Sequence, residues 1–281
     1  MDMIKFEKLQ GTGNDFIIFK EEEVKNLELK KLAAKVCNRR FGIGADGMML
    51  VSNSDIADIK MDFYNADGSI ATMCGNGIRC FSKFVYDNQI LTNTKFEVET
   101  LAGIMKVEIK LKDDKAELVK VNLGRPKFVA KEIPENSEDQ RLFEREIKID
   151  GQILKINSLV IGTIHTVIIV DEFEKLNLET IGKKLEYHPL FPMKTNVNFC
   201  KIIDDENIEV LTWEKGVGMT LACGTGAAAS SIVGIMLYNC SDNINVKVKG
   251  GNLEIEQMNE EIFMTGSAEL ICKGSYNLDN Y

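Results

Sequence analysis

The feature that most constrains how this chain can fold is a short sequence that occurs twice. Its copies are Met73-Cys74-Gly75-Asn76-Gly77 and Ala222-Cys223-Gly224-Thr225-Gly226, and a helical-looking apolar stretch follows each of them. The two cysteines are 223 − 74 = 149 residues apart, and the flanking residues agree at the same offset without gaps. Because a chance match of a short motif would not extend into its flanks, we expect the chain to consist of two homologous halves.

The agreement also reaches upstream, toward the start of each half. Residues 11–14 correspond to residues 162–165 if the second half is shifted by two residues. In this alignment His165 is the counterpart of Asn14. A pseudo-twofold arrangement of such halves is expected to bring the two cysteines together across a cleft between two lobes.

Strand-like segments outnumber helical ones, which predicts an α+β fold. Short alternating or apolar runs predict the strands, and helical spacing appears in residues 29–38, 78–86 and 227–238. Each half is therefore expected to be a β-rich, barrel-like sheet around a central helix. The charged segment 131–145, which contains Pro134, is expected to link the halves.

The length of 281 residues is sufficient for two domains that each bury a core. We expect the N-terminal lobe, with Cys74, to span residues 1–125, and the last strand, residues 266–281, to be the candidate for its completion. The C-terminal lobe, with Cys223, is then expected to span residues 126–265.

Charge and composition exclude several classes of partner. The formal net charge is −9 and the basic residues form no stripe, which argues against nucleic acid and anionic membrane surfaces. No signal peptide or apolar run long enough to span a bilayer is present, so a cytoplasmic location is expected. Seven scattered cysteines fit free thiols in a reducing compartment, and two histidines without ligand spacing argue against a metal site.

The two cysteine turns are suited to removing and returning a proton at a carbon next to a carboxylate. Backbone N–H groups at a helix N-terminus bind anions, and the helix dipole there favours a thiolate. Glycine beside the cysteine lets those N–H groups approach a carboxylate closely. With one thiolate and one thiol on opposite faces of the carbon, deprotonation on one side and reprotonation on the other would invert the centre. The other five cysteines, 37, 80, 200, 240 and 272, are expected to be small core residues.

These motifs make the chain resemble the diaminopimelate epimerases, the two-cysteine amino-acid epimerases and racemases that work without pyridoxal phosphate. The resemblance covers nearly the whole chain and includes Gly11-Thr12-Gly13-Asn14-Asp15-Phe16, Tyr64-Asn65-Ala66-Asp67-Gly68, the two cysteine turns, His188-Pro189-Leu190-Phe191-Pro192, Thr195-Asn196-Val197 and Gly216-Val217-Gly218. It implies a two-lobed fold, no cofactor, a small amino acid as the partner, and a homodimer.

The resemblance also implies roles for individual residues. Cys74 and Cys223 would be the acid–base pair, and His165 and Glu214 would tune the thiols or bind the substrate ammonium. The remaining substrate-binding positions that the resemblance implies are Asn14, Asn65, Gly75, Asn76, Asn196, Glu214, Lys215, Gly224 and Thr225.

Two departures from the family pattern concern the far end of the substrate. The usual Gly-Asn-Pro-His is Gly162-Thr163-Ile164-His165 here, and the usual Glu-Arg is Glu214-Lys215. By resemblance, the missing asparagine and arginine hold the distal carboxylate of diaminopimelate, and lysine lacks the bidentate fork of arginine. The first hypothesis is therefore a racemase for an amino acid without a distal carboxylate, such as histidine. The alternative is a diaminopimelate epimerase in which Lys215 pairs with that carboxylate.

Three further classes are weighed against these. Proline racemases and hydroxyproline epimerases also use two cysteines, but by resemblance their first turn carries a histidine where this chain has Asn76. The related isomerases of this fold lack the cysteine pair. Outside the enzymes, a redox-sensing protein could use two facing thiols to form a disulfide.

Overall fold

The computed structural model describes residues 3–128 and 142–278, which form two compact units. The N-terminal unit comprises Met1–Val121 and Thr265–Tyr281, and the C-terminal unit comprises Asn122–Met264. Within the described residues, none of the helices is long and apolar enough to cross a membrane.

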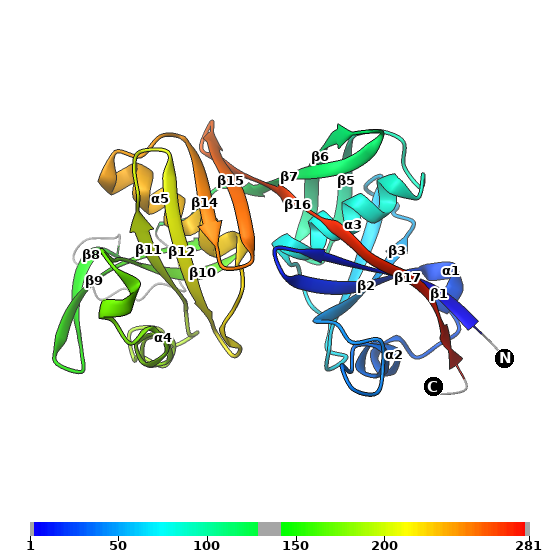
Figure 1. The fold of residues 1–281 in the computed structure, drawn as a ribbon, viewed down its shortest axis with the longest axis horizontal. Helices are drawn as coiled ribbons and strands as arrows, with labels where there is room; N and C mark the ends of the chain where they lie inside the picture. Colours follow the sequence, from blue (N-terminus) through cyan, green and yellow to red (C-terminus); the bar gives the residue numbers. More distant parts are fainter. Residues whose placement is uncertain (1–2, 129–141, 279–281) are drawn as a thin grey trace. The chain divides into compact units, whose positions relative to one another are not determined.

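The N-terminal unit is a mixed sheet with one central helix (Figure 1). Its elements are β1 (Met3–Gly11), β2 (Asn14–Lys20), α1 (Glu21–Val24), α2 (Leu29–Val36), β3 (Gly47–Ser52), β4 (Ile59–Asn65), α3 (Gly75–Asp87), β5 (Lys95–Thr100), β6 (Gly103–Lys112), β7 (Lys115–Gly124) and β17 (Glu269–Asn277). The last strand of the chain pairs antiparallel with β1, so residues from both ends of the sequence complete this unit. Helix α3 lies against β1, β2 and β3.

The C-terminal unit repeats this plan. Its elements are β8 (Leu142–Ile149), β9 (Gln152–Ile161), β10 (Thr163–Ile169), a 3₁₀ turn η1 (Phe173–Lys175), α4 (Leu178–Glu186), β11 (Asn196–Ile202), β12 (Asn207–Glu214), β13 (Gly218–Met219), α5 (Gly224–Tyr238), β14 (Asn243–Val248), β15 (Gly251–Met258) and β16 (Glu261–Ser267). In the N-terminal unit β2 pairs parallel with β3, and β3 pairs antiparallel with β4. In the C-terminal unit β10 likewise pairs parallel with β11, and β11 pairs antiparallel with β12. The predicted internal repeat is therefore present in the topology.

The central helix of the C-terminal unit is buried on every side through most of its length. Residues 226–234 are small or apolar and are all buried, and the helix contacts six strands of its own unit. Alanine favours the helix intrinsically, and small side chains let the surrounding sheet approach closely. Asn239 ends the helix in the left-handed conformation with φ of 53°.

The strand register corrects the predicted upstream alignment. Strand β2 begins at Asn14 and β10 begins at Thr163, which is the same 149-residue offset as between the cysteines. The parallel pairs Phe16–Gly47 and His165–Asn196 keep this offset as well. The predicted two-residue shift is therefore wrong: Phe16 is the counterpart of His165, and Thr163 is that of Asn14. Both strands bury five consecutive residues, so their apolar pattern looks alike after a shift of two.

Only the last part of the predicted linker lies within the described residues. Residues 131–141 lie outside the described residues. Residues 142–145 are the first part of strand β8, which pairs antiparallel with β9. At these residues the prediction of a linker is wrong, because Leu142 is buried in the core of the C-terminal unit.

Candidate functional site

In the N-terminal unit, Cys74 is the residue directly before helix α3. Its backbone is extended, so the helix begins at Gly75 and the first N–H groups of the turn lack intrahelical acceptors. The turn requires glycine at position 77, since a Cβ there would lie 2.2 Å from Cε of Met49 and 3.5 Å from the ring of Phe16. The thiol of Cys74 is half-buried and lies 3.6 Å from Oδ1 of Asn14, to which it donates.

The amide of Asn14 is oriented by a cluster of charged residues. Its Nδ2 donates to the carboxylate of Asp46, which leaves Oδ1 directed at the thiol of Cys74. Arg39 donates to both Asp46 and Asp15, and Lys8 lies 2.9 Å from Asp15. Burial alone would raise the pKa of Asp15, but hydrogen bonds from Arg39 and Lys8 outweigh it and lower the pKa to about 2.

This cluster makes the stability of the protein depend on pH in the acid range. A carboxylate whose pKa is depressed in the folded state stabilises the fold above its unfolded pKa, and this contribution disappears as the pH falls through the folded value. Asp15→Asn is expected to cost about 2 kcal/mol at neutral pH, and the wild-type advantage should vanish between about pH 4 and pH 2. Urea unfolding of both proteins across this range measures the difference. An advantage that persists unchanged at the acid end would contradict it.

A buried arginine donates hydrogen bonds to the first cysteine turn. Arg79 is fully buried and its guanidinium donates to the carbonyl of Gly75, to Oδ1 of Asn76, to Thr12 and to the carbonyl of Ser267. Burial lowers its pKa. No role for this residue was predicted from the sequence. The available signal was an arginine beside the apolar residues Ile78, Cys80 and Phe81, because arginine is almost never fully buried unless it is paired.

Asn65 is the last residue of β4 and contacts the turn that follows this strand. Its side-chain nitrogen donates to the hydroxyl of Ser69 at 2.9 Å, and its backbone N–H donates to the carbonyl of the same residue. The side chain is half-buried. Asn65 therefore closes a turn, and its expected role in binding substrate stays a prediction.

In the C-terminal unit, Cys223 stands directly before helix α5 in the same extended conformation. It is buried, with 7% of its surface exposed. Its sulfur lies 3.5 Å from Oγ1 of Thr225. A Cβ at position 226 would lie only 2.3 Å from Oδ1 of Asn198, so glycine is required here as in the first turn, but against a polar neighbour.

A chain of polar side chains leads from Cys223 into the core of this unit. Nε2 of His165 lies 3.0 Å from Oγ1 of Thr225, and Nδ1 lies 3.2 Å from Nδ2 of Asn198. Oγ1 of Thr212 donates to Oδ1 of Asn198 at 3.0 Å. Burial, with the positive charge of Lys215, lowers the pKa of His165 to about 3. The sequence analysis predicted His165 but not Asn198 or Thr212.

The two residues that depart from the family pattern contact each other. Nζ of Lys215 donates to Oγ1 of Thr163 at 3.0 Å. The backbone N–H of Lys215 donates to Oδ1 of Asn196, which leaves the NH₂ group of Asn196 to serve as a donor. Glu214, the preceding residue, accepts a hydrogen bond from Thr220. The predicted residues Thr163, Asn196 and Lys215 are thus brought together, next to Glu214 in the chain.

Most of the other cysteines are buried, as predicted. Burial raises the pKa of Cys37 and of Cys80 to about 12, and it raises the pKa of Cys200 and of Cys240. These thiols are therefore protonated at neutral pH. Cys272 differs from the prediction: it is exposed on β17 and is not a core residue.

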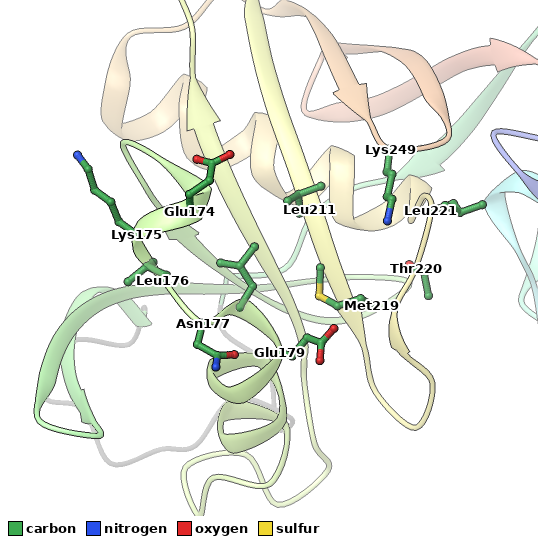
Figure 2. Close-up of a pocket in the computed structure, with 11 residues that line it drawn as sticks. Glu174, Lys175, Leu176, Asn177, Glu179, Leu211, Met219, Thr220, Leu221 and Lys249 are labelled. Carbon is green, nitrogen blue, oxygen red and sulfur yellow. The ribbon is translucent and has the colours of Figure 1, made fainter.

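The described residues hold no metal-binding cluster, and a pocket lies in the C-terminal unit. Among residues 3–128 and 142–278 no group of three or more His, Cys, Asp or Glu side chains could hold a metal ion. A pocket of about 620 Å³ in the C-terminal unit is lined by residues of η1 and α4, by Leu211, by residues 219–221 and by Lys249 (Figure 2). Cys223 and His165 are not among its lining residues, although Leu221 stands two residues before Cys223.

Comparisons with known proteins match the whole chain. The family model described as diaminopimelate epimerase matches residues 6–129 and 158–271. The diaminopimelate epimerase of Caldanaerobacter subterraneus is 44% identical, over 98% of this chain and 100% of the relative. That of Alkaliphilus metalliredigens is 45% identical, over 97% of both chains. That of Methanothermobacter thermautotrophicus is 40% identical, over 97% and 98%.

Solved structures of much lower identity share the fold. A hydroxyproline epimerase from Agrobacterium vitis superposes with a TM-score of 0.72 at 14% identity, over 99% of this chain and 93% of that one. A protein of the phenazine biosynthesis PhzF family from Bacillus anthracis gives 0.69 at 16%, over 99% and 100%. The predicted α+β fold, with two halves that are each a β-rich sheet around a helix, is confirmed.

Proposed function

Because the chain belongs to the diaminopimelate epimerase family, and is therefore an isomerase that works without pyridoxal phosphate, we propose that it interconverts LL- and meso-diaminopimelate. The observation that carries this proposal is similarity over the full length to enzymes of that name, with both cysteine turns intact. The comparisons thus favour the alternative named above over the histidine hypothesis.

The proposed reaction is proton exchange at one α-carbon. A thiolate removes the α-proton and the other thiol supplies a proton from the opposite side. Cys74 and Cys223 are the two groups, since each stands directly before a helix, whose first N–H groups have no acceptor within the helix. Those N–H groups, from Gly75-Asn76 and Gly224-Thr225, would hold the α-carboxylate, where the helix dipole favours negative charge.

Lys215 is the proposed partner of the distal carboxylate. Its Nζ is positioned by the hydroxyl of Thr163, and Asn196, which accepts from its backbone N–H, has an NH₂ group to donate. A lysine supplies one charged contact where arginine would supply a fork. We therefore expect weaker binding of diaminopimelate than an arginine at this position would give.

The role of Lys215 can be tested with two substitutions. Lys215→Met is expected to raise KM for diaminopimelate roughly tenfold to a hundredfold, because a hydrogen bond to a charged group is lost. Lys215→Arg, the matched control, should keep KM near the parent value or lower it. Steady-state kinetics with purified proteins measure both. Equal KM values for the parent and Lys215→Met would show that the lysine does not bind the distal carboxylate.

A second candidate substrate is an amino acid without a distal carboxylate, such as histidine. It is favoured by the contact between Lys215 and Thr163, since these two residues replace the arginine and asparagine of the family pattern. With such a substrate, Lys215→Met would leave KM nearly unchanged.

The deciding experiment is solvent deuterium exchange into the α-carbon, followed by mass spectrometry. The panel includes diaminopimelate, lanthionine, histidine, lysine, ornithine, glutamate and proline. Label in diaminopimelate or lanthionine alone is the expected result. Label that appears faster in histidine would replace the proposal with the second candidate. No label in any of them would reject both and favour a thiol-based redox sensor.

A further inference from the structure

The polar chain behind Cys223 has no counterpart in the other half of the repeat. The residues at the same 149-residue offset from His165, Asn198 and Thr212 are Phe16, Met49 and Phe63. In the N-terminal unit these three are apolar and buried, and the two phenyl rings pack edge to face with centroids 5.8 Å apart. In the C-terminal unit all three positions are buried and hydrogen-bonded to one another. A role specific to Cys223 would explain this difference, because apolar residues already satisfy the packing at these positions.

The orientation of the Asn198 amide follows from its neighbours. Its Nδ2 faces the backbone carbonyl of Thr166 at 3.5 Å, and a carbonyl can only accept. The opposite orientation would place Oδ1 against that carbonyl and would leave the hydroxyl of Thr212 without its acceptor. The NH₂ group of Asn198 therefore faces Nδ1 of His165 and donates to it.

The remaining directions follow from the first. A neutral imidazole has one N–H, and because Nδ1 accepts from Asn198 the proton is on Nε2. Nε2 then donates to Oγ1 of Thr225, so the single hydrogen of this hydroxyl is available for Sγ of Cys223. Every donor along the chain points toward the sulfur.

We propose that Asn198, supported by Thr212, is a positioning residue that holds His165 in the Nε2–H tautomer and thereby makes the sulfur of Cys223 a hydrogen-bond acceptor. This inference rests on the proposed function, since it assigns a thiolate-stabilising device to one of the two reacting cysteines. A sulfur that accepts a hydrogen bond is stabilised as the thiolate.

Lys215 acts on His165 electrostatically, and it disfavours a second proton on the ring. Glu214 accepts from Thr220, and the first turn of α5 carries no acidic residue. The side chain of Asn198 bonds to His165, Thr166 and Thr212, and not to Lys215 or Glu214. The tautomer of His165 is therefore set by the amide of Asn198.

The first test needs no substrate and no variant of the device. The chain has two histidines, so ¹⁵N-histidine NMR of the whole protein gives two ring systems, and His188→Gln assigns them. We expect His165 to show a bare Nδ1 and a protonated Nε2 at every pH from about 5 to about 9. A protonated Nδ1, or a ring that titrates in this range, would overturn the proposal even if the enzyme is active on diaminopimelate.

The second test uses variants. Asn198→Leu should give a mixture of tautomers and lower kcat about tenfold to a hundredfold with KM nearly unchanged, as expected when a hydrogen bond to a charged group is lost. The acid limb of the pH–rate profile should move to higher pH, because the thiolate of Cys223 would be less stabilised. Thr212→Val should act in the same direction more weakly, and Thr212→Ser, which keeps the hydroxyl, should restore parent behaviour.

Thr225 separates the device from general packing. Thr225→Val should lower kcat as much as Asn198→Leu does, yet leave the tautomer of His165 intact, whereas Thr225→Ser should retain activity. A loss of activity in Asn198→Leu with an unchanged tautomer would reduce Asn198 to a structural residue and overturn the proposal. These rates are measured on whichever amino acid the exchange panel labels, so a failure of the diaminopimelate assignment would remain distinguishable.

Discussion

Replacing either Cys74 or Cys223 by serine is expected to lower kcat/KM by at least about 10³-fold, because a positioned acid or base typically contributes 10²–10⁴-fold and a serine hydroxyl is a far weaker acid than a thiol. Both variants should remain folded. Serine is close to cysteine in size, and each position stands at a helix start, so the substitution creates little empty space. Epimerisation followed by polarimetry or chiral chromatography measures the loss.

Cys272→Ser is the matched control for this pair. Cys272 is exposed on β17, and its substitution should leave the rate unchanged. If only one of the two serine variants were inactive, a mechanism with one cysteine base would replace the two-base proposal. If both kept parent activity, the chemistry would have to be placed elsewhere in the chain.

Arg79→Met is expected to give the largest loss of stability, about 3 kcal/mol or more in the free energy of unfolding. The substitution removes the donor to four groups at once, and each buried acceptor left unsatisfied costs about 1–3 kcal/mol, partly relieved by relaxation. Activity should fall as well, because two of these groups, the carbonyl of Gly75 and the side chain of Asn76, belong to the cysteine turn. Urea denaturation measures the first effect and the exchange assay the second.

The control for Arg79 is an arginine outside any such contact. Arg40 is exposed, and Arg40→Met should change the free energy of unfolding by less than about 0.5 kcal/mol. Arg79→Lys keeps the charge but not the planar fork, so an intermediate loss is expected. Equal stabilities of Arg79→Met and Arg40→Met would show that the buried hydrogen bonds contribute nothing net.

Much of the fold could be predicted from the sequence because its main signals are local. The glycine turns, the apolar stretches after Cys74 and Cys223, and the alternating segments each depend on neighbours in the chain. They led to helices α2, α3 and α5 and to the internal repeat, but α1 and α4 were not predicted. The strand register could not be obtained in the same way, since a strand with five buried residues in a row carries no mark of its alignment.

The parts of the site that the sequence left out depend on contacts between distant residues. Asn198 meets His165 only because β10 and β11 pair in parallel, and Thr212 joins them from the next strand. Arg79 has a partner 188 residues away in Ser267. No sequence motif predicted a role for Asn198, Thr212 or Arg79. Cys272 is likewise exposed because residues 269–273 of β17 are all exposed, which the sequence pattern of that strand does not reveal.

The paired glycines of the two cysteine turns bear on how the halves of a duplicated chain can diverge. One glycine makes room for a methyl group of Met49 and the other for the carboxamide of Asn198. Introducing histidine at position 16 alone would bury a polar ring among phenyl and thioether groups. Introducing phenylalanine at position 165 alone would remove a hydrogen-bonding partner from the buried polar pair Asn198 and Thr212. The three positions are therefore strongly epistatic. Only a joint exchange of all three residues would transfer the arrangement of one half to the other. A chain whose halves began identical would therefore need a coupled change at these three positions for the polar side chains behind Cys223 to stand in one half alone.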